Sequence, residues 1–132
     1  MTSATYGISK NLGRVDFDTA VERVTEALKT EGFGVLTEID VKATLKKKLD
    51  VDFRQYKILG ACNPPLAHKA LQKEPLIGLL LPCNVVVFEE DDGTITASAV
   101  DPKEMFKVVT NPELGNVAEM VSAKLEKAIA AF

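Results

Sequence analysis

The chain has 132 residues, which is the usual length of one domain and enough to bury a single hydrophobic core. Apolar residues make up 46% and charged residues 27%, a composition that excludes an intrinsically disordered chain. The formal net charge is −3, so the chain lacks the basic excess that nucleic-acid binding requires. We therefore expect one domain over residues 1–132 and no nucleic-acid partner.

Nothing in the sequence indicates export or membrane insertion. The segment from Met1 to Tyr6 lacks the basic start and the apolar core of a signal peptide. The longest apolar stretch, Leu76 to Phe88, is interrupted by Pro82 and Asn84 and is too short to span a bilayer. We expect a cytoplasmic protein without a membrane partner, in which both cysteines are reduced thiols.

The first half of the chain predicts three strands and two helices. Residues 4–11 are typical of a strand, with Tyr6 and Ile8 on one face. Apolar residues at helical spacing predict a long helix over 16–31, which Asp16 caps and Gly32 ends. The next elements are a strand over 33–38, a short helix over 41–49 and a strand over 55–61.

The second half predicts a helix, a hairpin and a final long helix. Asn63-Pro64-Pro65 is typical of a helix start, and Pro75 ends that helix. The next strand is predicted over 79–89, and Asp91-Asp92-Gly93 predicts the turn that follows. The strand over 94–100 alternates, with Ile95, Ala97 and Ala99 expected to face inward and Thr94, Thr96 and Ser98 outward. A strong 3.6-residue period predicts a helix over 112–132.

This order favours an α+β fold with a mainly antiparallel sheet and the two long helices packed on one face. The residues expected to be buried under these helices are Val21, Val24, Leu28, Val117, Val121 and Leu125.

The candidate site consists of two Cys-Asn dipeptides beside prolines. Cys62-Asn63 lies where a strand passes into a helix, and a helix start can lower the pKa of a nearby thiol. Pro64 and Pro65 remove two of the amides that would do so. Cys62 is therefore either a functional thiol or a small buried hydrophobe, with Asn63 as a simple helix cap.

The second dipeptide, Cys83-Asn84, follows Pro82 inside an apolar strand. A proline there indicates a sheet edge or a bulge, and a buried asparagine would need several hydrogen bonds. If the two strands are antiparallel neighbours, Cys62 and Cys83 lie at one end of the sheet, with Cα atoms within about 10 Å and no disulfide in the cell. Parallel strands would separate them.

Metal binding is an open alternative for this site. Cys62, Cys83 and His68, the only histidine, could supply three ligands to a soft metal ion, with Glu38 or a water as the fourth. His68 is also compatible with an ordinary surface position. The spacing of the cysteines is not a zinc signature, and the acidic residues, the loops and the turns contain no recognised catalytic motif. No cofactor is required by the sequence.

Several segments resemble the prokaryotic domain of unknown function 302 family. They are Gly32-Phe33-Gly34-Val35-Leu36, Ile39-Asp40-Val41, Ile58-Leu59-Gly60-Ala61-Cys62-Asn63-Pro64 and Leu79-Leu80-Leu81-Pro82-Cys83-Asn84-Val85. The resemblance implies a β-α-β4-α fold like that of the TATA-binding protein, with an antiparallel sheet. It does not imply DNA binding, because a shared fold is not a shared function. Some relatives lie near genes of sulfur metabolism. The family's function is not established, so the resemblance assigns no catalytic residues.

Three functions remain open at this point. The first is a domain that binds a small ligand, an anion or a soft metal through Cys62, Asn63, Cys83, Asn84 and Glu38. The second is a thiol enzyme or redox protein that uses Cys62 and Cys83. The third is an interaction domain without a small-molecule site. We also expect a homodimer, because a small chain with this apolar content has at least one strand edge to cover.

Overall fold

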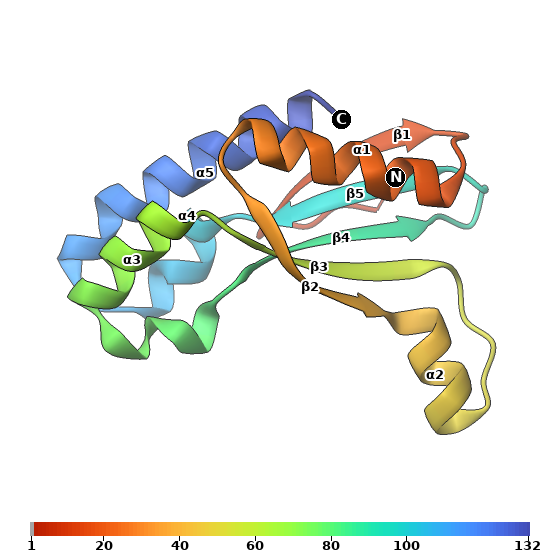
Figure 1. Ribbon diagram of the computed structural model, residues 1–132, viewed down its shortest axis with the longest axis horizontal. Coiled ribbons are helices and arrows are strands. Elements are labelled where there is room, and N and C mark those ends of the chain that lie inside the picture. The colour runs from red at the N-terminus through yellow and green to blue at the C-terminus, as the bar shows by residue number, and fades with distance from the viewer. Residues whose placement is uncertain (1) are drawn as a thin grey trace.

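A computed structural model describes residues 2–132 of the chain and shows an α+β fold (Figure 1). The elements in chain order are β1 (Gly7–Gly13), α1 (Phe17–Thr30), β2 (Gly34–Asp40), α2 (Val41–Leu49), β3 (Tyr56–Cys62), α3 (Pro64–Lys73), the 3₁₀ turn η1 (Pro75–Leu80), β4 (Cys83–Glu89), β5 (Ile95–Val100), α4 (Pro102–Met105), the 3₁₀ turns η2 (Phe106–Val108) and η3 (Pro112–Leu114), and α5 (Gly115–Ala130).

The five strands form one sheet in the order β1-β5-β4-β3-β2, and every neighbouring pair is antiparallel. The prediction of an antiparallel sheet with the order β-α-β4-α is confirmed. The predicted hairpin is also confirmed, since β4 pairs with β5 across the turn at Asp91-Asp92-Gly93. The two edges of the sheet belong to β1 and β2.

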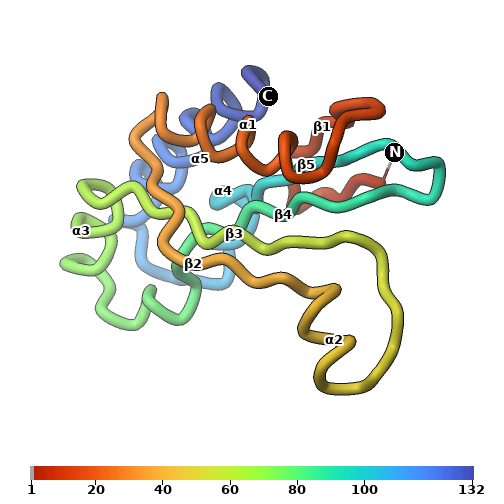
Figure 2. Tube along the Cα trace, turned by 45° about the vertical axis from the view of Figure 1, so that its right-hand side comes forward, coloured from red at the N-terminus to blue at the C-terminus, as the bar shows by residue number. Residues whose placement is uncertain are grey.

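Helices α1 and α5 lie side by side on one face of the sheet, as predicted (Figures 1 and 2). Asp16 caps α1, because its carboxylate accepts a hydrogen bond of 3.1 Å from the backbone N–H of Thr19. The six residues expected under the two helices are all buried: Val21, Val24, Leu28, Val117, Val121 and Leu125. They pack against the inward side chains of the central strands, which include Leu59, Val85, Val87, Ile95, Ala97 and Ala99.

The strand boundaries differ from the prediction at two places. The first strand starts at Gly7, so Tyr6 lies outside it and is exposed. The fourth strand starts only at Cys83, because residues 75–80 form the 3₁₀ turn η1. Pro82, whose peptide bond to Leu81 is cis, precedes the strand. A proline has no N–H for a ladder, and β4 is a central strand, so pairing starts after it. The predicted edge or bulge at Pro82 is therefore wrong.

Thr96 is a further exception, since it is fully buried although the alternation placed it on the outward face. Its hydroxyl donates a hydrogen bond of 2.6 Å to the carboxylate of Glu90 and accepts one of 3.4 Å from the side-chain amide of Asn11. Polar side chains therefore cover Thr96 on the face of the sheet opposite the two long helices. The alternation of apolar and polar residues along one strand does not reveal such neighbours.

The β2 edge and α2 extend away from the rest of the molecule (Figures 1 and 2). Helix α2 has no buried residue, and the last five residues of β2 are exposed. No helix formed by residues 2–132 has the length and apolar character to cross a membrane.

Candidate functional site

The two cysteines lie at the same end of the sheet. Cys83, the first residue of β4, pairs directly with Ala61 of β3, and Cys62 is the next residue along β3. An antiparallel register of this kind separates the Cα atoms of Cys62 and Cys83 by about 6 Å. The prediction that they share one end is confirmed, and both are free thiols in the structure.

Asn63 holds the start of α3 in place. Its side-chain oxygen accepts a hydrogen bond of 3.4 Å from the backbone N–H of Leu66, and its side-chain nitrogen donates one of 3.3 Å to the carbonyl oxygen of Glu31. The side chain therefore links α3 to the end of α1 and is buried. Both of its polar atoms are already engaged within the protein, so the interpretation of Asn63 as a helix cap is confirmed.

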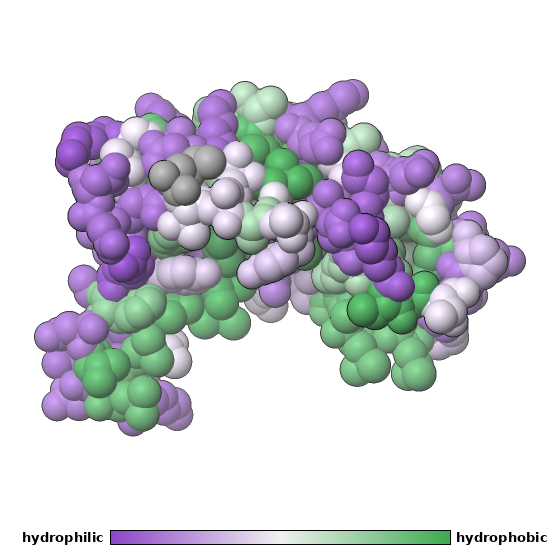
Figure 3. Space-filling view, turned by 180° about the vertical axis from the view of Figure 1, so that it is seen from behind, coloured by the Kyte–Doolittle hydropathy of each residue, from purple (hydrophilic) through white to green (hydrophobic). Residues whose placement is uncertain are grey.

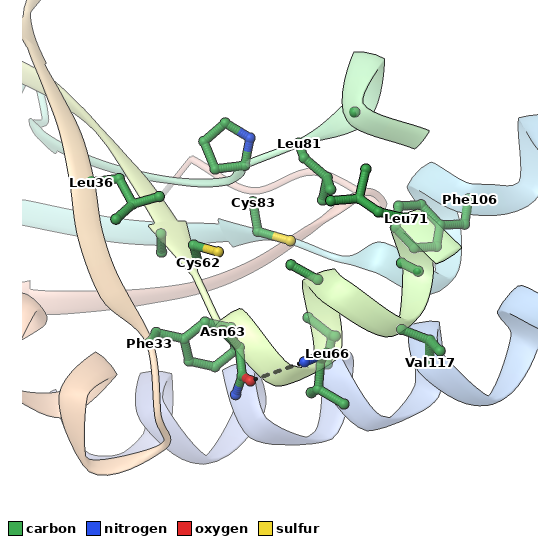
Figure 4. Close-up of a pocket in the computed structure, with 16 residues that line it drawn as sticks. Phe33, Leu36, Cys62, Asn63, Leu66, Leu71, Leu81, Cys83, Phe106 and Val117 are labelled. Atoms are coloured by element: carbon green, nitrogen blue, oxygen red, sulfur yellow. Dashed lines mark hydrogen bonds between the residues drawn. The ribbon is translucent and has the colours of Figure 1, made fainter. Parts of the chain in front are cut away.

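A cavity of about 300 Å³ opens beside these residues, between the end of the sheet, α3 and α5 (Figure 4). Cys62 and Cys83 form part of its wall, and their side chains extend toward it from β3 and β4. Their neighbours Ala61 and Asn63 also line it, and the remaining wall comes from five other parts of the chain: Phe33, Leu36, Leu66, Ala67, Ala70, Leu71, Gly78, Leu81, Pro82, Phe106, Val117 and Val121. None of the lining residues in the described part of the chain carries a charge.

Glycines allow the close packing at this end. At Gly60, which pairs with Asn84, a Cβ atom would clash with the side chain of Thr37 and would lie 2.8 Å from Pro82 Cγ. Gly32 has a φ of +84°, and its missing side chain leaves room for the Asn63 amide, which would lie 3.1 Å from an added Cβ.

Three of the predicted site residues lie away from the cavity. Asn84 is exposed, since successive side chains of a strand point to opposite faces and Cys83 points inward. His68 is exposed on α3 and does not line the cavity, although the preceding residue, Ala67, does. Glu38 forms an ion pair of 2.8 Å with Lys57 instead, and the hydrogen bond from this pair raises the pKa of Lys57.

The structure does not assemble a metal site from the candidate ligands Cys62, Cys83, His68 and Glu38. Among residues 2–132, no three His, Cys, Asp or Glu side chains come together closely enough to hold a metal ion. Cys62 and Cys83 are neighbours, but the exposed side chain of His68 and the paired carboxylate of Glu38 do not join them.

The two thiols differ in their surroundings. Cys83 is buried, and this burial, followed by repulsion from the neighbouring Cys62, raises the pKa of its thiol to about 11. Cys62 is only half-buried at the cavity wall. Cys83 is consequently protonated at neutral pH and acts as an apolar wall residue.

The sequence alone did not indicate most of the cavity wall. Phe33, Phe106, Val117 and Val121 look like ordinary core residues in their local patterns, and Leu71 looks like part of the apolar stripe of its helix. The local signals in the sequence were three prolines. Pro64 and Pro65 follow Cys62-Asn63, and Pro82 precedes Cys83, and they indicate that the two strands end and begin at this end of the sheet.

The fold and the cavity together define a class of protein, a small α+β domain with two long helices over one sheet face and an apolar pocket at one sheet end. The model of the family described as "Domain of unknown function DUF302" matches residues 8–132, so the chain belongs to this family. The chain is similar to an uncharacterized conserved DUF302 protein from Bacillus stearothermophilus, known from a crystal structure. The two are 30% identical, with a TM-score of 0.88 over 97% of this chain and 98% of that chain. None of the curated proteins is significantly similar to this chain.

Proposed function

We propose that this protein binds a small, uncharged, apolar molecule in the cavity between the sheet end, α3 and α5. The observation that carries this proposal is the cavity itself, which has a volume of about 300 Å³ and a wall of aliphatic, aromatic and thiol groups. Small-molecule sites are typically concave and mostly apolar, and this volume falls at the small end of their range.

The polar groups of the wall favour a neutral ligand over an anion or a metal ion. The side chain of Asn63 is engaged by Leu66 and Glu31, and Cys83 is a neutral thiol. Pro64 and Pro65 deprive the start of α3 of two amides that would otherwise attract an anion. An ionic ligand would lose its hydration here without gaining a partner, which costs free energy.

Thiol catalysis has weaker support. The raised pKa of Cys83 makes its thiol a poor nucleophile, because the thiolate is the reactive form. Cys62 reaches the cavity but has no histidine beside it, since His68 points outward on α3. In this proposal both thiols contact the ligand as soft apolar groups.

Binding is tested with N-phenyl-1-naphthylamine, a neutral apolar dye whose fluorescence rises in apolar surroundings. We expect saturable binding with one site per chain. The Ala67→Phe variant, which fills the cavity from the half-buried face of α3, abolishes it. The matched control is Lys69→Phe, which places the same side chain on the exposed face of the same helix and leaves binding unchanged.

Circular dichroism must show that both variants are folded. The absence of saturable binding to the wild-type protein, or equal binding by the two folded variants, contradicts the proposal.

A further inference from the structure

The outer edge of the sheet and the helix beyond it are unpartnered in the single chain. We call the segment Gly34–Leu49 the β2–α2 surface. Strand β2 ends the sheet, and its last five residues, including Leu36 and Ile39, are exposed. Helix α2 has an apolar stripe of Val41, Leu45 and Leu49, but none of these is buried. A helix of nine residues is marginal in water without tertiary packing, so this surface needs a cover.

Exposed leucines lie at the cavity and on the turn η1 beside it. Leu36 and Leu71 line the cavity and are 67% and 41% exposed. Leu76 and Leu79 do not line it, but they lie on η1 beside Gly78, which does, and are 73% and 82% exposed. Seen from behind, the molecule is hollowed between an apolar lobe at α2 and a second one at α3 and η1 (Figure 3). A partner of matching shape would enter this hollow.

We propose that a second copy of this chain covers the β2–α2 surface and closes the cavity mouth. Two β2 edges can pair antiparallel about a twofold axis, which joins the two sheets into one. The antiparallel pairing reverses the direction of the partner's strand. The partner's α2, which follows its Asp40, then lies beside the Gly34 end of β2, where the cavity opens. The apolar stripe of α2 thereby meets these exposed leucines.

Pairing of this kind is compatible with the strand sequence. The irregularity in β2 lies between Val35 and Thr37, so Thr37–Asp40 is a regular stretch without proline or lysine.

Charge complementarity also favours a copy of the same chain. Helix α2 carries four lysines in a chain whose net charge is −3, so the remainder of the chain is strongly acidic. The cavity end offers Glu31, two residues before Phe33, and Glu74, between α3 and η1, beside the exposed Lys69 and Lys73 of α3. Strand β2 and helix α2 contribute seven and nine residues, and the exposed leucines at and beside the cavity bring each side to about 20, the size of a standard interface.

The oligomeric state tests the interface directly. Light scattering at roughly 50 µM, where a dimer of micromolar affinity is populated, should give the mass of two chains. The Leu49→Glu variant changes a side chain that is 66% exposed in the single chain, so it should fold normally and scatter as a monomer. Ile39→Arg in β2 should do the same. The matched control, Val108→Glu, changes an exposed apolar residue outside the surface and should remain a dimer.

Closure of the cavity rests on the proposed function and has its own measurement. We expect the monomeric Leu49→Glu variant to bind N-phenyl-1-naphthylamine roughly tenfold more weakly, a loss of about 1.4 kcal/mol. Weaker binding with an unchanged dimer mass would contradict the interface. A dimer that never binds the dye contradicts the proposed function and leaves the interface standing.

Other outcomes overturn the inference. A monomeric wild-type protein would do so, and its sedimentation with phosphatidylglycerol vesicles would assign the β2–α2 surface to lipid instead. A wild-type dimer that Leu49→Glu and Ile39→Arg leave intact would place the interface elsewhere.

Discussion

Cys83 pairs with Ala61 at the end of the β3–β4 ladder, next to Cys62, and the two neighbouring thiols differ in burial. Cys83 is buried in the cavity wall, and Cys62 is half-buried there. This difference between neighbouring thiols has consequences for reactivity and for the pH dependence of stability.

The two cysteines should react at very different rates. In the Cys62→Ser variant the remaining thiol, Cys83, is buried and has a pKa of about 11, so it should react with iodoacetamide slowly at pH 8. In Cys83→Ser the remaining Cys62 should react faster. The measurement is the alkylation rate by mass spectrometry, with urea-unfolded protein as the control, in which both rates become equal. A faster native rate for Cys83 would show that the buried wall opens.

Stability should fall at high pH through Cys83. Its folded pKa of about 11 is above the ordinary value of 9.0, so above pH 9 the unfolded chain releases a proton that the folded chain retains. The contribution is fully present below pH 9 and is lost as the pH rises to 11, by about 2 kcal/mol. Urea unfolding with reductant at pH 8 and pH 10.5 measures it.

Lysines and tyrosines titrate over the same range, so the comparison is made between variants. Cys83→Ala should lose most of this extra decline, whereas Cys62→Ala, the same change at the neighbouring thiol, should retain it. Equal declines in the two variants would show that other groups cause it.

Asn63→Ala should destabilise the fold by about 1–2 kcal/mol, because the N-cap of α3 is lost and the Glu31 carbonyl loses its donor. Asn63→Asp keeps the acceptor that caps the helix and removes only the donor, so its cost should be smaller. Urea midpoints rank the three proteins. A variant Asn63→Ala as stable as wild type would mean that the link between α1 and α3 contributes nothing.

Two glycine-to-alanine substitutions should change the free energy of unfolding in opposite directions. Gly32→Ala places a Cβ at a φ of +84° and 3.1 Å from the Asn63 amide, so we expect a loss of about 1–2 kcal/mol. Gly115→Ala, at the helical start of α5 with open space around it, should stabilise by about 0.5–1 kcal/mol. Thermal or urea unfolding of the pair measures both, and a stabilising Gly32→Ala would contradict the local geometry.

Much of the fold followed from local patterns. The 3.6-residue period of α1 and α5, the caps at Asp16 and Asn63, and the turn at Asp91-Asp92-Gly93 involve residues within a few positions of each other. Such patterns report which side of an element is apolar, and this determines both the element and its buried face. The placement of the two cysteines at one end then required only that β3 and β4 be antiparallel neighbours.

The cavity and its use were decided by the tertiary structure. Its wall combines Phe33 after α1, Cys62 at the end of β3, Phe106 in η2 and Val117 in α5, and no local pattern relates these positions. Asn84 and His68 resembled site residues, but both are exposed. Asn84 points to the opposite face of β4 from Cys83, and His68 lies on the exposed side of α3. The burial of Thr96 depends on Glu90 and Asn11, which come from separate segments.

Sequence by itself therefore determined the helices, the hairpin, the antiparallel class and the candidate cysteines, because short-range periodicity and capping depend on neighbouring residues. Only the tertiary structure decided that Cys62 and Cys83 line an apolar pocket, that Glu38 pairs with Lys57, and that the β2–α2 surface is left uncovered. These properties depend on which side chains from distant segments fill or leave open the same space, and packing at that range has no signature in the order of the residues.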